Sequence, residues 1–217
     1  MWPVKKKLLL FRGRSPASLD FLGAQLGQNV ASLTLDAFNN GSNSFGPPDP
    51  GQFIFVVCGS NSGTSGVFTS CVVAGLPAAI LTPSLPSQNT GAVFVAPVPR
   101  IERGNITVTM STAFESSAIG IWRAVGYGGL RTDAFAVNSS SAQSLATTAM
   151  GAAVGVAGTA SATPGFSSGL INRANLSDGF GYGWRFGDVV GTLPGALSID
   201  ASWTSYPLLA AAAFAQM

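Results

Sequence analysis

The sequence predicts an all-β fold, an antiparallel β-sandwich. Short runs rich in Val, Ile, Phe and Thr recur along the 217 residues, and clusters of Gly, Pro, Asn and Ser separate them. This is the pattern of short strands joined by turns. Residues 106–111 alternate Ile, Val and Met with Thr and Ser, as expected of a strand with one buried face. Many short strands with Gly/Ser/Pro-rich connections are typical of a sandwich.

Each expected strand is bounded by residues that cannot continue it. Residues 52–57 are apolar on both faces and predict a central strand, and the loop before them, 39–51, holds three prolines, which lack a ladder donor. Helix signals are weak, and the best candidate is 18–25, two turns that Ser18 would cap. The strands expected are residues 6–11, 30–38, 52–59, 67–73, 78–81, 92–97, 105–111, 118–125, 132–137, 143–148, 152–157, 168–172, 182–186, 198–203 and 208–215.

Charge divides the chain into two parts. The first fourteen residues hold five basic side chains, and no lysine follows them: Lys5, Lys6, Lys7, Arg12 and Arg14. The rest carries six arginines against nine carboxylates, and charged residues make up only 9% of the chain, against roughly 25% in ordinary soluble domains. We therefore expect a basic N-terminal arm at residues 1–17 and a single β-sandwich domain at residues 18–217.

So little charge predicts a chain that packs among other subunits. Surfaces of Ser, Thr, Asn and Gln contact one another without counterions, whereas a monomer with few charges is poorly soluble. The arm's charges suit nucleic-acid phosphates, an anionic membrane surface or an acidic neighbouring subunit. Because residues 8–11 are apolar, the arm is not a plain polybasic tail. We expect copies of the chain and other subunits as partners, rather than nucleic acid or membrane.

No segment predicts a membrane span or an export signal. Apolar runs stay far below the roughly 20 residues of a spanning helix. The lysines before Leu8 resemble the start of a signal peptide, but Arg12 ends its apolar part after four residues, short of the roughly 7–15 required. Synthesis in a reducing cytoplasm then predicts free thiols at Cys58 and Cys71. A hairpin around residues 61–65 would place the two opposite each other, which leaves a bridge open as the alternative.

Residues that carry common chemistry are scarce. The chain has no histidine, which removes the usual general base and the commonest transition-metal ligand. A glycosidase needs two carboxylates across a cleft, and folding can pair Asp178 with Asp188 or Glu102 with Glu115. We expect no catalytic residue, no cofactor and no metal site, and keep the glycosidase as the least favoured alternative.

An aromatic segment with alternating glycines, 179–187, admits two interpretations. Tyr182, Trp184 and Phe186, with Arg185, can form an exposed ledge that stacks on a cell-surface glycan or a protein partner. Alternatively, they form a core strand whose glycines leave room for side chains of a facing strand. We favour the core strand.

Five segments follow one another in the order strand, Pro/Asp/Gly loop, hydrophobic strand and, later, a Trp-bearing strand. They are LDFLGAQLG at 19–27, VASLTL at 30–35, PGQFIFVVCGS at 50–60, ITVTMS at 106–111 and IGIWRAV at 119–125. This layout resembles β-sandwich virion proteins of tailed bacteriophages, which are often jelly rolls. It contains no catalytic or binding motif, so it assigns no residue a role.

The resemblance implies a jelly-roll-like, non-enzymatic virion protein. Its expected place is the tail, the tail tip or the base of a fibre, where it would assemble through the arm. Capsid decoration, a head fibre and a carbohydrate- or receptor-binding module are the alternatives.

Overall fold

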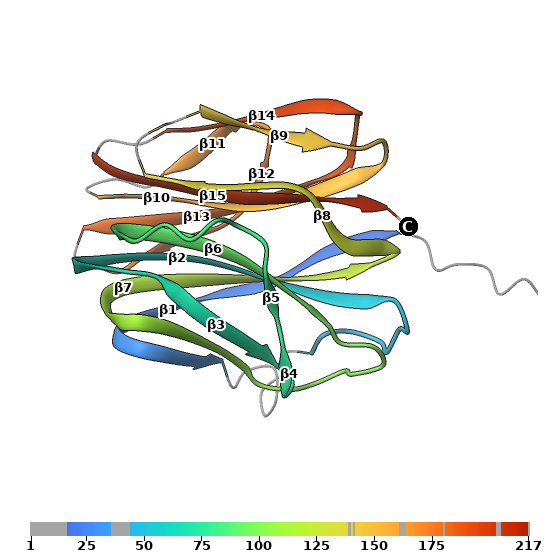
Figure 1. The fold of residues 1–217 in the computed structure, drawn as a ribbon, viewed down its shortest axis with the longest axis horizontal. Coiled ribbons are helices and arrows are strands. Elements are labelled where there is room, and N and C mark those ends of the chain that lie inside the picture. The colour runs from blue at the N-terminus through green and yellow to red at the C-terminus, as the bar shows by residue number, and fades with distance from the viewer. Residues whose placement is uncertain are drawn as a thin grey trace, which may run out of the picture.

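The computed structural model describes residues 17–35, 44–138, 140, 142–160, 164–179, 181–202 and 205–216. Over these residues the protein is all-β, as predicted, and every strand pairing is antiparallel (Figure 1). The strands are β1 (Ser18–Leu35), β2 (Gln52–Gly66), β3 (Phe68–Val73), β4 (Leu76–Pro77), β5 (Ala79–Ile80), β6 (Ser87–Pro97), β7 (Ile106–Val125), β8 (Tyr127–Val137), β9 (Ala142–Thr147), β10 (Gly151–Ala160), β11 (Gly165–Ser168), β12 (Ile171–Ser177), β13 (Tyr182–Thr192), β14 (Gly195–Ser202) and β15 (Ser205–Gln216).

The long strand β7 organises the largest sheet, which has seven strands. The second half of β7 lies between β1 and β2, with Ser18 and Gln52 both opposite Val125. Its first half lies between β1 and β3, where Leu35 and Val73 both face Ile106. β1 follows β7 through two register shifts, and bulges of this kind bend a strand pair. The sheet therefore curls over itself (Figure 1).

Alternation along β2 fills two different cores. Ile54, Val56 and Cys58 point into a first core that the curled sheet encloses. Phe55 and Val57 point into a second core, which lies between this sheet and the five-stranded sheet β12-β13-β10-β15-β8. The continuous apolar run of β2 thus follows from burial on both faces, and the central strand predicted at 52–57 is confirmed.

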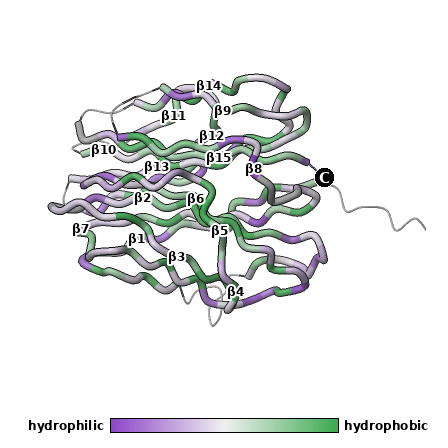
Figure 2. Tube along the Cα trace, in the orientation of Figure 1, coloured by the Kyte–Doolittle hydropathy of each residue, from purple (hydrophilic) through white to green (hydrophobic). Residues whose placement is uncertain are grey.

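A third core makes the five-stranded sheet an inner layer as well. It lies between that sheet and the three-stranded sheet β11-β14-β9, at the top of the stack in Figure 1. In β10, Val154 and Val156 face the second core, whereas Ala153 and Ala157 face the third. Figure 2 shows the matching hydrophobic colour along the inner strand β15. Double burial explains why these strands are rich in Ala, Val, Leu and Gly.

Two expectations for secondary structure are corrected. Residues 18–25, the candidate helix, are the start of β1, and they pair with β7 from Val125 to Ile119. This strand extends the one expected at 30–38, because a long ladder outweighs a weak helical preference. The strand expected at 168–172 is interrupted at Gly169, whose φ of +82° ends β11 before β12 begins.

Cys58 and Cys71 are buried free thiols, but they do not face each other across a hairpin. Cys58 pairs with Ala92 and Ile119, and Cys71 pairs with Val108. The expected hairpin around 61–65 is therefore wrong, because β7 lies between β2 and β3 in the sheet order. Both thiols point into the first core.

In the described part of the chain, no helix has the length and hydropathy that a bilayer crossing requires.

Candidate interaction surface at the root of the arm

The five basic residues expected to form the assembly arm lie outside the described residues; they are Lys5, Lys6, Lys7, Arg12 and Arg14. The structure describes the chain from Ala17, and Ser18 already pairs with Val125. The root of the arm is therefore fixed to the largest sheet by β1. Any contact that the arm makes starts from this end of the molecule.

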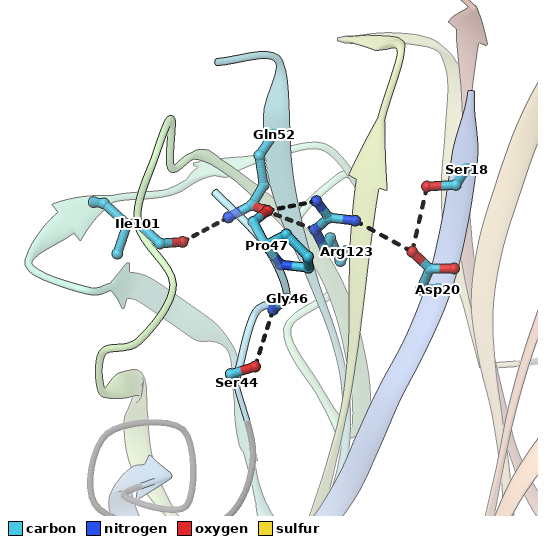
Figure 3. Close-up of polar contacts among 8 residues, drawn as sticks. All are labelled: Ser18, Asp20, Ser44, Gly46, Pro47, Gln52, Ile101 and Arg123. Carbon is cyan, nitrogen blue, oxygen red and sulfur yellow. Dashed lines mark hydrogen bonds and ion pairs between the residues drawn. The ribbon is translucent and has the colours of Figure 1, made fainter. Parts of the chain in front are cut away.

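Arg123, on β7, ties the strands together at this end. Its Nε donates to Oε1 of Gln52 on β2 at 2.7 Å, and one terminal nitrogen donates to the carbonyl oxygen of Pro47 at 2.8 Å (Figure 3). The other terminal nitrogen lies 3.5 Å from the carboxylate of Asp20 on β1. The Arg123 side chain is only 12% exposed. Its donors thus serve the protein's own strands and loops, which makes it a structural clamp.

Gln52 extends this clamp to the loop between β6 and β7. Its Nε2 donates to the carbonyl oxygens of Ile101 at 2.8 Å and Val98 at 3.3 Å, and the residue is 1% exposed. A buried amide needs such partners, because an unpaired one would lose its hydrogen bonds to water. Asp20 is different: Ser18 donates to it at 3.3 Å, yet its side chain remains 52% exposed.

An open groove of about 570 Å³ lies beside this clamp. It runs between the start of β1, the start of β8 and the paired ends of β10 and β13, where the backbone N–H of Met150 donates to the carbonyl oxygen of Thr192 at 2.8 Å. Most of its lining is apolar, and Asp20 is its one carboxylate among the described residues. The residues that line it are Ala17, Ser18, Leu19, Asp20, Tyr127, Met150, Val190, Gly191 and Gln216.

Met150 is the most unusual residue of the groove. Its φ is +58°, in the left-handed region that favours Gly or Asn, and its side chain is nevertheless large, apolar and 60% exposed. Val190, on the same wall, is 49% exposed. Strained backbone that presents an apolar side chain to solvent is more typical of a binding surface than of a passive turn.

The exposed aromatic ledge is not present. Tyr182 is 6% exposed, and Trp184 and Phe186 are wholly buried in the second core, so none can stack on a ligand. The Tyr182 hydroxyl donates to Oδ1 of Asn89 at 2.9 Å, and burial raises its pKa. Arg185 points to the other side of β13, where its Nε donates to the carbonyl oxygen of Pro164 at 3.1 Å.

Glycines make this burial possible, as the favoured interpretation required. A Cβ at Gly59 on β2 would lie 2.7 Å from the Trp184 ring, and one at Gly158 on β10 would lie 2.5 Å from it. A Cβ at Gly120 on β7 would lie 2.5 Å from Phe186. The large rings occupy the space that missing side chains leave on neighbouring strands.

Sequence reasoning missed a buried ionic cluster around Asp188. Its carboxylate is wholly buried, accepts from the indole N–H of Trp122 at 2.7 Å, and pairs with Nε and a terminal nitrogen of Arg173 at 2.9 and 2.8 Å. The hydrogen bond to Asp188 raises the pKa of Arg173. A lone acid within an otherwise apolar strand was the available signal, because a buried carboxylate needs a cationic partner.

Of the two carboxylate pairs considered for a glycosidase, Asp178 with Asp188 does not face a cleft, because Asp188 is wholly buried. Asp188 is enclosed with Arg173 and Trp122, and Glu102 and Glu115 are both exposed at the surface. The groove offers only Asp20. Among the described residues, no group of three or more Cys, Asp or Glu side chains is placed to hold a metal ion.

No protein-family model matches this chain, and no curated protein matches it.

Proposed function

We propose that this chain is a non-enzymatic structural subunit of a tailed-phage virion, a jelly-roll-like β-sandwich that attaches to its neighbours through the arm at residues 1–17. The tail, the tail tip or the base of a fibre is its expected place, and head decoration is the alternative. The observation that carries the proposal is the position of the arm's root, which lies in the wall of a groove with exposed apolar side chains.

The body of the protein supports a structural role. The charged side chains of Arg123, Arg173 and Asp188 bind other parts of the fold. The inner sheets are filled on both faces, as expected of a rigid building block. A glycan-binding role is less favoured, because Tyr182, Trp184 and Phe186, the residues expected to stack on a sugar, are buried.

Association with particles tests the proposal. Virions purified by density gradient from a lysate in which the chain is expressed should contain it in stoichiometric amounts by quantitative mass spectrometry. A chain without residues 1–16 should fold but be missing from the particles. A chain found only in the soluble fraction of the lysate would contradict the proposal.

The lysines provide a finer test of the arm. Replacing Lys5, Lys6 and Lys7 with Gln should weaken incorporation, more at low salt than at high salt, because exposed charge contacts are screened over about 8–10 Å at physiological ionic strength. Arg100→Gln, an exposed cation on the body, is the control and should leave incorporation unchanged.

A further inference from the structure

We propose that the groove at the root of the arm binds residues Leu8–Phe11 from a second copy of this chain, so that two copies exchange arms about a two-fold axis. The inference rests on the proposed role of the arm and names the arm's receptor. Each copy would supply one arm and one groove at the same end of the molecule. Such a self-complementary contact is the kind that closes a symmetric dimer.

The groove suits an apolar segment. Leu19, Tyr127, Met150 and Val190 all line it, and the last two are 60% and 49% exposed. Leu193, which follows the hydrogen-bonded Thr192, is 82% exposed. Exposed apolar patches usually mark contact sites. In a chain with so few charged residues, little else offsets the low solubility of such a patch.

Charge is complementary too. Asp20 lies in the groove wall with its side chain 52% exposed. In the arm, Lys7 precedes and Arg12 follows the apolar residues 8–11. An apolar segment seated in the groove therefore brings a cation close to Asp20 in either direction.

The connection between groove and arm favours a second copy over the chain's own arm. Ala17 is part of the groove wall, and residues 12–16 separate it from Phe11. Five residues can span at most about 17 Å. With so short a connector, a segment rooted in the groove wall reaches the matching groove of a partner at the same end of the molecule, which closes a two-fold pair.

Strand addition along β1 is the competing mode, and the structure disfavours it. β1 pairs with β7 along one edge, but its register shifts between Phe21 and Gly23 and between Val30 and Ser32. Bulges of this kind interrupt the regular row of donors and acceptors that an added strand requires.

Engineered cross-linking shows whether the arm in the groove comes from the same chain or from a second copy. Cys58 and Cys71 are buried, so Leu10→Cys and Met150→Cys introduce the only accessible thiols of the described fold and arm. After mild oxidation of a mixture of the two single variants, a covalent heterodimer is expected on a non-reducing gel. Ile171→Cys, a site on β12 that is 55% exposed, replaces Met150→Cys in the control and should give none. A double variant that cross-links only within one chain, or equal yields with Ile171→Cys, would overturn the proposal.

Sedimentation equilibrium measures the dissociation constant of the dimer, and a variant that keeps its fold separates loss of contact from loss of structure. Met150→Asn removes the apolar side chain but suits the left-handed backbone, so the melting temperature of the monomer, measured at a concentration below the dissociation constant of the dimer, should not fall. The dissociation constant of the dimer should rise about tenfold or more, as for a central apolar contact. Ile171→Asn should leave it unchanged. An unaltered dimer in Met150→Asn would overturn the proposal.

The same variants separate this inference from the proposed function. If removal of residues 1–16 abolishes particle incorporation while Met150→Asn dimerises normally, the arm's role stands and the groove is not its receptor. If the truncated chain enters particles normally, the proposed function fails, and the heterodimer cross-link alone decides whether arms are exchanged.

Discussion

Trp122 donates its indole N–H to the carboxylate of Asp188 at 2.7 Å, between the two largest sheets. Trp122 belongs to β7 and Asp188 to β13, and both side chains are wholly buried. Arg173, on β12, completes the charge balance from the partly exposed side. One carboxylate thereby joins three strands from two sheets, and it fixes how the sheets face each other.

Removing the cation of this cluster should be more harmful than removing the whole ion pair. Arg173→Met leaves a buried carboxylate with Trp122 alone and should cost about 2–3 kcal/mol in the free energy of unfolding. The double variant Arg173→Met/Asp188→Leu should lose less than the sum of the two single variants. Urea unfolding measures this difference, and Arg185→Met is the matched control. Additive losses would show that the pair does not act as a unit.

A single methyl group should distinguish tight glycines from open ones. Gly158→Ala would place a Cβ 2.5 Å from the ring of the buried Trp184 and should destabilise the protein by about 1–3 kcal/mol. Gly165→Ala meets its nearest atom, Oγ of Ser202, at 3.5 Å and should change stability by less than about 0.5 kcal/mol. Thermal unfolding of both variants tests the packing of the second core. Equal melting temperatures would contradict it.

Two truncations should define where the arm ends and the fold begins. Removal of residues 1–16 leaves β1 whole, so the melting temperature of the monomer, measured at low protein concentration, should be unchanged. Removal of residues 1–27 also takes away Phe21, whose ring lies edge-on to Trp122 at 5.0 Å, and uncovers one side of β7. Loss of that apolar contact alone should cost about 1.5–3 kcal/mol. Both truncations remove Trp2, so near-ultraviolet circular dichroism of the two should be compared with each other, and the longer one should lose the signal of Trp122 packed against Phe21.

Stability should fall in alkaline solution because of the two thiols. Burial raises the pKa of Cys71 to about 12, and burial together with the neighbouring Cys71 raises that of Cys58 well above 9.0. In the unfolded chain both thiols ionise near pH 9. Their contribution to stability is therefore full below pH 9 and is lost as the pH rises towards 12, by up to about 1.4 kcal/mol per pH unit for each thiol.

Urea unfolding at pH 8, 9 and 10 tests this pH dependence. Cys71→Ala is less stable at pH 8 because it leaves a small cavity. Its free energy of unfolding should decline less steeply with pH than that of the unaltered protein. Parallel pH profiles would show that Cys71 does not titrate differently in the folded state.

The sequence predicts strands well where burial leaves a continuous apolar pattern. The strands expected at 92–97, 152–157 and 208–215 lie within β6, β10 and β15. The helix expected at 18–25 was wrong, because Leu and Ala at mixed spacing suit a helix as well as a strand. Their conformation is decided by β7, a partner about a hundred residues away, and no local pattern contains that information.

The candidate surface was harder to predict than the fold. The sequence shows an arm with basic and apolar residues, but the groove combines Leu19, Tyr127, Met150 and Val190 from four separate strands or turns. The burial of Trp184 likewise depends on Gly59 and Gly158, which lie on other strands. Side chains brought together only by strand register leave no spacing signal along the chain.

The register of β1 has a consequence for synthesis. Ser18 pairs with Val125, and Leu35 pairs with Ile106, so β1 leaves the ribosome long before its partner exists. At about 5–20 residues per second, the 90 residues from 36 to 125 take roughly 5–18 s to translate. During that time β1 is an unpaired apolar strand on a nascent chain. Ribosomes that follow one another on a single message then hold several such strands close together, and premature pairing between nascent copies competes with folding until β7 emerges.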